Sequence, residues 1–274
     1  MSLLNFNFES YYLKGNTNVS MVLPDRPREQ DPKSYYKSGE KYKVLWLLHG
    51  TYGDNSDWIR KSMVEIYARE KNLILVMPAA LNTNYSNWPK FSLGFDMYNF
   101  LIEELMPVVY NWFPIASSKR EDNYIAGLSM GGRGTLMYGL NAPEKFAAAA
   151  CLSAAPFDAE SLDLESNDPR ASRMRGIVEN AGGMEGYLAS RDNSWRLCRE
   201  LAGDSKLPRF YFAIGKDDFL YDNWKKFRAF CEDIGFDATF EEYDGYTHEW
   251  RFWDLTIQRA IKFFGLSGKD GDTF

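Results

Sequence analysis

The chain has 274 residues, of which 45% are hydrophobic and 26% are charged, as in globular proteins with a sizeable core. Its 32 basic and 38 acidic residues give a formal net charge of -6, so it lacks the positive field that a nucleic-acid backbone requires. The N-terminus has no basic start followed by an apolar run, and no later run approaches the roughly 18 apolar residues of a membrane span. We therefore expect a soluble cytoplasmic protein that binds neither nucleic acid nor a membrane.

The cysteines and histidines indicate that the chain holds no metal and no other cofactor. Cys151, Cys198 and Cys231 are widely spaced, odd in number and without a CxxC motif, which favours reduced structural thiols over a disulfide framework or a zinc site. Catalytic zinc usually takes two or three histidine ligands. His49 and His248 are the only histidines, so any histidine chemistry falls to one of them.

The first forty residues predict a hairpin and a loop. Alternating apolar and polar residues at 5–13 (NFNFESYYL) and 18–24 (NVSMVLP) favour two antiparallel strands with turn residues between them. Residues 25–41 are polar and rich in proline and charge, which is typical of an exposed loop.

From residue 43 onward, short apolar runs alternate with amphipathic segments. The predicted strands cover residues 43–50, 73–78, 123–127, 147–153, 209–215 and 238–244. The predicted helices cover residues 56–72, 95–113 with Pro107 as a kink, 131–141, 221–234 and 249–264. With the opening hairpin, this alternation predicts an α/β fold: a mostly parallel eight-stranded sheet with helices on both faces.

Residues 157–206 interrupt this rhythm with polar, helical sequence that breaks at residues 179–183 (ENAGG). We interpret this segment as a small cap inserted over the sheet. Since no repeat, low-complexity tract or composition shift marks a linker, we expect one domain over residues 1–274.

The pentad GLSMG at residues 127–131 follows a predicted strand and opens a predicted helix, which is the setting of a nucleophile elbow. The pentad alone leaves Ser129 open between a nucleophile and a small residue in a tight turn. A phosphate-binding loop fits less well, because the segment lacks the GxxxxGK[ST] pattern.

A serine nucleophile needs a general base, and His248 lies where one should fall. It follows the last predicted strand, and the loops at the carboxyl ends of parallel strands converge. A surface-loop histidine is the alternative. His49 precedes Ser129, which is the wrong order for the base, and we expect it to order its own loop.

The base in turn needs a carboxylate that fixes its tautomer. The loop after the strand at residues 209–215 offers Asp217, Asp218 and Asp222, and the residue pattern does not choose among them. Capping of the following helix is the alternative role for such residues.

Acyl transfer also needs two backbone donors directed at the developing oxyanion. We expect the amide of Met130, directly after the serine, to be one donor. The amide of Thr51, in the glycine-containing loop HGTYG, is the second candidate, and a plain turn is the alternative.

Several of these segments together resemble the esterase D group of α/β-hydrolases over about residues 44–264, and most of all its bacterial tributyrin esterase branch. They are LWLLHGTYGDNSDWIR, GFDMYNFLIEELMPVV, SKREDNYIAGLSMGGRG, GKDDFLYD and GYTHEW. The resemblance implies the α/β-hydrolase fold, with Ser129 as nucleophile, Asp218 as the acid and His248 as the base. A matching loop in relatives would place Trp88 in the pocket wall, although ordinary packing is the alternative for this tryptophan.

The function that we expect is a cofactor-independent serine esterase that hydrolyses short-chain acyl esters through an acyl-enzyme. Acetylated or feruloylated carbohydrate is within the range of substrates that the resemblance implies. The alternatives are an S-formylglutathione hydrolase or an acyltransferase of the same family, and a non-catalytic binding protein on the same fold. The only partner that we expect is a small ester, and a homo-oligomer stays open.

Overall fold

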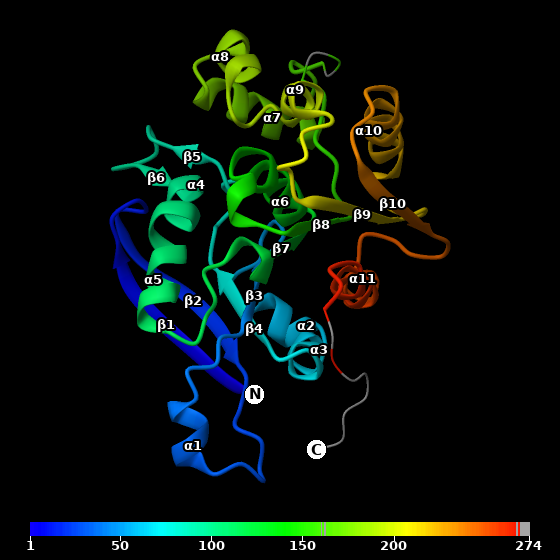
Figure 1. Ribbon diagram of the computed structural model, residues 1–274. Coiled ribbons are helices and arrows are strands. Elements are labelled where there is room, and N and C mark those ends of the chain that lie inside the picture. The colour runs from blue at the N-terminus through cyan, green and yellow to red at the C-terminus, as the bar shows by residue number, and fades with distance from the viewer. Residues whose placement is uncertain (160, 162, 267, 269–274) are drawn as a thin grey trace.

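The computed structural model describes residues 1–159, 161, 163–266 and 268, and an eight-stranded sheet runs through them (Figure 1). The strand order is β1-β2-β4-β3-β7-β8-β9-β10. These strands are β1 (Ser2–Ser10), β2 (Gly15–Leu23), β3 (Lys43–Leu48), β4 (Leu73–Pro78), β7 (Asn123–Leu128), β8 (Ala148–Leu152), β9 (Arg209–Gly215) and β10 (Ala238–Tyr243). β1 pairs antiparallel with β2, and β2 with β4, whereas all other neighbours are parallel, which confirms the predicted sheet.

Helices cover both faces of the sheet, as the near-continuous apolar strands require. The α-helices of the described residues are α1 (Pro32–Lys37), α2 (Asp57–Lys61), α3 (Val64–Glu70), α4 (Met97–Asn99), α5 (Met106–Trp112), α6 (Met130–Asn141), α7 (Pro169–Asn180), α8 (Met184–Ala189), α9 (Ser194–Leu201), α10 (Tyr221–Asp233) and α11 (Trp250–Phe263). One core cluster joins the sheet to α4, α5, α6 and α10, and a second joins it to α2, α3 and α11 (Figure 1).

The predicted helix over residues 56–72 is two helices, α2 and α3. Ser62 separates them with an extended backbone (φ -142°, ψ 173°). Its hydroxyl donates to the carbonyl of Trp58 and accepts from the amide of Val64. Side-chain hydrogen bonds of this kind compete with the backbone hydrogen bonds of a helix and interrupt it here. The amphipathic period of the sequence nevertheless continues across the break.

The helix predicted over residues 95–113 begins at Met97 and ends at Trp112, and it is continuous but not uniformly α-helical. α4 leads directly into a π-helical segment, Phe100–Leu105, and this leads into α5, with Pro107 in the first turn of α5. Proline has no N–H to donate, so the wider π-type hydrogen bonding just before it accommodates the missing bond.

Two further elements differ from the sequence predictions: a short helix lies within the predicted loop, and a short ribbon includes the first two residues of the helix predicted over residues 95–113. Within residues 25–41 the short helix α1 begins after Asp31, whose carboxylate accepts from the amide of Ser34 at 2.8 Å, while no residue of α1 is buried. A two-stranded ribbon, β5 (Asn87–Trp88) and β6 (Phe95–Asp96), lies beside the start of α4 (Figure 1).

The segment 157–206 holds α7, α8 and α9, which gather at the top of Figure 1, where α9 contacts α6. The predicted break at residues 179–183 is confirmed, because α7 ends at Asn180 and α8 begins at Met184. Throughout the part of the chain that the structure describes, no helix has the length and apolar character needed to cross a bilayer.

Candidate active site

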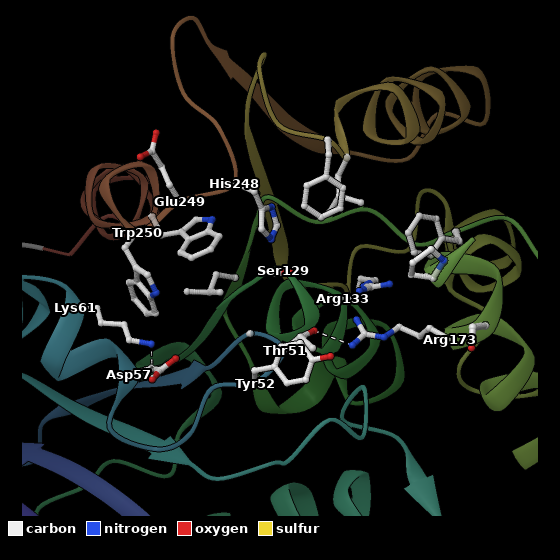
Figure 2. A pocket seen from close by; sticks show the side chains of 18 residues that line it. Thr51, Tyr52, Asp57, Lys61, Ser129, Arg133, Arg173, His248, Glu249 and Trp250 are labelled. Atoms are coloured by element: carbon white, nitrogen blue, oxygen red, sulfur yellow. Dashed lines mark hydrogen bonds and ion pairs between the residues drawn. The ribbon is translucent and has the colours of Figure 1, made fainter. Parts of the chain in front are cut away.

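A cavity of about 900 Å³ lies where the loops after β3, β7, β9 and β10 meet (Figure 2). Its lining includes Thr51, Ser129 and His248, each contributed by a different loop. Segments that are far apart in sequence therefore meet at the carboxyl ends of parallel strands, as the sequence predicts.

Ser129 forms the turn between β7 and α6. Its backbone is in a left-handed region (φ 53°, ψ -115°), which is strained for a residue with a side chain. The amide of Ser129 donates to the carbonyl of Leu152, and its carbonyl accepts from the amide of Arg133, so neighbouring elements hold the turn from both sides. Only 8% of the residue is exposed, and that part faces the cavity. This is the strained turn that the GxSxG motif predicts.

The flanking glycines are required by close backbone approaches. A Cβ atom on Gly127 would lie 2.4 Å from the carbonyl group of Gly131, and one on Gly131 would lie 2.4 Å from the carbonyl oxygen of Leu48. These distances are far inside van der Waals contact. The start of α6 can therefore approach the end of β3 only if these two positions lack side chains.

Asp218 and His248 are hydrogen-bonded to each other. Nδ1 of His248 lies 2.8 Å from Oδ2 of Asp218, and Oδ1 of the same carboxylate accepts from the amide of Leu220 at 2.9 Å. The Asp218 side chain is fully buried, whereas 19% of the His248 side chain is exposed. A buried acceptor of this kind fixes the imidazole with its proton on Nδ1 and leaves Nε2 free to act as a base.

Aromatic rings hold the imidazole from two directions. The ring centroid of Phe219 lies 4.7 Å from that of His248, and the centroid of Trp253 lies 5.0 Å away in an edge-on arrangement. All three residues line the cavity, in which His248 stands on the side toward Ser129 (Figure 2). This packing restricts the imidazole to a small range of orientations.

His49 orders its loop, as predicted. Its Nε2 accepts from the amide of Ala80 at 2.9 Å, and its Nδ1 lies 2.7 Å from the carbonyl oxygen of Gly50, to which it must donate. The ring is therefore neutral, and burial lowers the pKa of His49 below its ordinary value of 6.5. The hydroxyl of Tyr85 donates to the carbonyl of His49 and so also holds this loop.

Met130 directly follows Ser129 in the chain, and Thr51 lines the same cavity as Ser129. Within the described residues, neither amide donates a hydrogen bond to another group of the chain. The Thr51 loop is held by its neighbours instead: the amide of Tyr52 donates to the side chain of Asn82, and that of Gly53 to the carbonyl of Gly50. Both backbone amides are thus available to donate to a group bound in the cavity.

Two sequence candidates lie outside this arrangement. Trp88 is not among the described residues that line the cavity; it belongs to β5, its indole Nε1 donates to the carbonyl of Thr83, and its ring lies next to Gly176 of α7. Placing Trp88 in the wall of this cavity is thus wrong, because the two-stranded ribbon packs the ring against α7. Asp217 is exposed, and only its backbone amide is engaged, with the carbonyl of Tyr246.

Arg133 and Arg173 line the cavity, although the sequence reasoning did not single them out. A signal for Arg133 exists in the sequence: it is the only charged residue of α6, a helix that is otherwise almost entirely buried. No comparable signal exists for Arg173, whose position depends on how α7 packs over the sheet.

Comparisons with known proteins show which family the chain is similar to. A family model described as "Putative esterase" matches residues 10–264. An acetyl esterase from Caldicellulosiruptor saccharolyticus is 29% identical over 265 residues, which cover 96% of this chain and 97% of that protein.

Two solved structures from Staphylococcus aureus are also similar. The S-formylglutathione hydrolase FrmB is 30% identical, with a TM-score of 0.78 over 96% of this chain and 98% of that one. The fluorophosphonate-binding serine hydrolase FphF is 29% identical, with a TM-score of 0.77 over the same shares of the two chains.

Proposed function

Because this chain belongs to the putative esterase family and is a carboxylic ester hydrolase with the α/β-hydrolase fold, we propose that Ser129, His248 and Asp218 are its catalytic triad. The observation that carries the proposal is the 2.8 Å bond between Asp218 and Nδ1 of His248, at the edge of the cavity that Ser129 lines. The buried carboxylate leaves Nε2 of the imidazole free to accept the proton of the serine hydroxyl.

In the first half of the reaction, Oγ of Ser129 attacks the ester carbonyl while Nε2 of His248 removes the hydroxyl proton. The carbonyl oxygen becomes an oxyanion, and the amides of Thr51 and Met130 donate to it. The tetrahedral intermediate then collapses. The bond to the alcohol breaks, His248 returns the proton to the leaving oxygen, and the acyl group stays on Ser129.

In the second half, water replaces the alcohol. His248 removes a proton from the water as it attacks the acyl carbon, the same two amides hold the oxyanion, and the proton returns to Oγ of Ser129 as the acid leaves. The carboxylate of Asp218 stabilises the imidazolium that forms in each half. Every group that the cycle needs comes from this chain or from water.

We propose short acyl chains as the acyl specificity, supported by the similarity to the acetyl esterase. An acetyl group fills little of a cavity of about 900 Å³, so most of that volume is available to the alcohol part of the substrate. The similarity to the S-formylglutathione hydrolase favours thioesters as a second candidate class.

The test is a panel of 4-nitrophenyl acetate, butyrate and octanoate together with S-formylglutathione, assayed with the wild type and with Ser129→Ala. We expect hydrolysis of the short esters to lose at least about three orders of magnitude in kcat when the nucleophile is removed. Activity of Ser129→Ala within about tenfold of the wild type would refute the mechanism. A higher kcat/KM for octanoate than for acetate would refute the acyl specificity alone.

A further inference from the structure

Two arginines stand in one wall of the cavity. Arg133 lies on α6, four residues after Ser129 and therefore one helical turn further along. Arg173 comes from α7, in the segment above the sheet, and Figure 2 shows the two side chains close together on the same side of Ser129. Glu249, a carboxylate of the lining that accepts from the amide of Thr247, lies on the opposite side of that view.

Neither guanidinium group has a carboxylate partner among the residues that the structure describes. Arg173 donates from Nη2 to the hydroxyl of Thr51 at 2.8 Å, and Arg133 lies over the ring of Phe157 at 5.1 Å from its centroid. Two other charged residues of the lining, Asp57 and Lys61, lie on the far side of the cavity from the arginines and pair with each other at 2.9 Å (Figure 2). The two arginines therefore give this part of the cavity a net positive charge.

Holding two like charges in a partly buried wall is unfavourable for the protein alone. Burial, with Arg173 nearby, lowers the pKa of Arg133 to about 9, and burial also lowers the pKa of Arg173. A guanidinium group stays charged at neutral pH in proteins, so the cost is present under ordinary conditions. A bound anion would offset it.

We propose that Arg133 and Arg173 bind an anionic group of the substrate, such as a carboxylate, carried close to the scissile ester on its acyl or its alcohol part. The guanidinium fork matches a carboxylate geometrically, and two such groups can hold both of its oxygens. Side chains one turn apart on a helix start about 6 Å from each other, so a carboxylate a few bonds from the reacting carbonyl reaches Arg133. The second arginine is anchored at the Thr51 loop, on which the proposed oxyanion site depends.

This proposal rests on the proposed function, and matched substrate pairs test it in the wild type without any substitution. On the alcohol side, 4-acetoxybenzoate is compared with 4-acetoxybenzamide. On the acyl side, monoethyl adipate is compared with ethyl adipamate. Each pair exchanges a carboxylate for a neutral amide of nearly the same shape. We expect kcat/KM to favour the carboxylate by at least about tenfold in one pair, which also identifies the side of the ester that carries the charge.

Variants then assign the preference to the two arginines. In the double substitution Arg133→Gln and Arg173→Gln, we expect the carboxylate-to-amide ratio of kcat/KM to fall to about one. Arg228→Gln is the matched control, because Arg228 pairs with Glu232 and Glu242 on α10 and β10, and the ratio should not change. Added salt should reduce the wild-type ratio, an effect that a purely structural role of the arginines would not produce.

The outcomes separate the two proposals. If the wild type hydrolyses both members of both pairs at equal kcat/KM, the anion site is refuted while the esterase mechanism stands. A carboxylate preference that survives in the double variant also refutes it. If no ester in the set is hydrolysed, including 4-nitrophenyl acetate, the proposed function itself fails.

Discussion

Gly131 is the position at which a single methyl group tests the geometry of the nucleophile turn. We predict that Gly131→Ala lowers kcat/KM by about 10²-fold without removing any chemical group from the site. The added Cβ would lie 2.4 Å from the carbonyl oxygen of Leu48 and 2.6 Å from that of His49. Both contacts are with backbone, so no side-chain rotation relieves them.

The size of the effect follows from these distances. Ordinary contact begins near about 3.4 Å, so α6 and the loop after β3 must separate by about 1 Å. This movement displaces Ser129 and the Met130 amide relative to the Thr51 amide. A misplacement of about 1 Å costs about 10²-fold in rate, and overpacking of this kind costs about 1–3 kcal/mol in the free energy of unfolding.

The assay is kcat/KM for 4-nitrophenyl acetate together with urea unfolding. Gly15→Ala serves as the control, because a Cβ on Gly15 meets no atom within 4 Å and the substitution should leave both quantities close to the wild type. The reasoning is refuted if Gly131→Ala is folded and keeps kcat/KM within about threefold of the Gly15→Ala protein.

Three further predictions concern individual contacts. Asp218→Asn should lower kcat by about 10³ to 10⁴-fold, because the amide no longer favours the proton on Nδ1 of His248. The kcat of Asp217→Asn should stay near that of the wild type. Equal losses of kcat in both variants would contradict the assignment of Asp218 as the acid. Burial lowers the pKa of His49 below 6.5, so the folded chain binds fewer protons at this residue than the unfolded chain. The free energy of unfolding should therefore fall as the pH drops below that value. Urea unfolding across the acidic range measures this fall, which should be shallower for His49→Gln. Asp254→Asn should cost about 1–3 kcal/mol in the free energy of unfolding, because Asp254 accepts from the amide of Met63 and the hydroxyl of Tyr67; an unchanged urea midpoint would show that these bonds contribute nothing.

The sheet and the order of the site residues could be predicted because their signals are local. Apolar runs of strand length, separated by amphipathic segments, indicate parallel strands with helices between them. Since the carboxyl ends of such strands share one edge, residues just after β7, β9 and β10 had to come together there. The pattern did not choose between Asp217 and Asp218, however. In the structure Asp218 is buried and hydrogen-bonded to His248, whereas Asp217 is exposed, which supports Asp218 as the proposed acid.

The remaining features depend on tertiary contacts that leave no periodic pattern. The break at Ser62 arises from side-chain bonds to Trp58 and Val64, within a segment whose amphipathic period is unbroken. Trp88 faces α7 because a short ribbon turns it that way. Arg173 reaches the hydroxyl of Thr51 only once α7 has packed above the sheet, and the 122 positions that separate these two residues give no hint of their contact.

The most direct test of the central claim is covalent labelling of the nucleophile. The protein is treated with a fluorophosphonate, weighed intact by mass spectrometry, and then digested so that the modified peptide can be sequenced. The account predicts one adduct per chain, located on Ser129, and none on Ser129→Ala. A wild-type protein that is folded and unlabelled, or an adduct on any other serine, would contradict it.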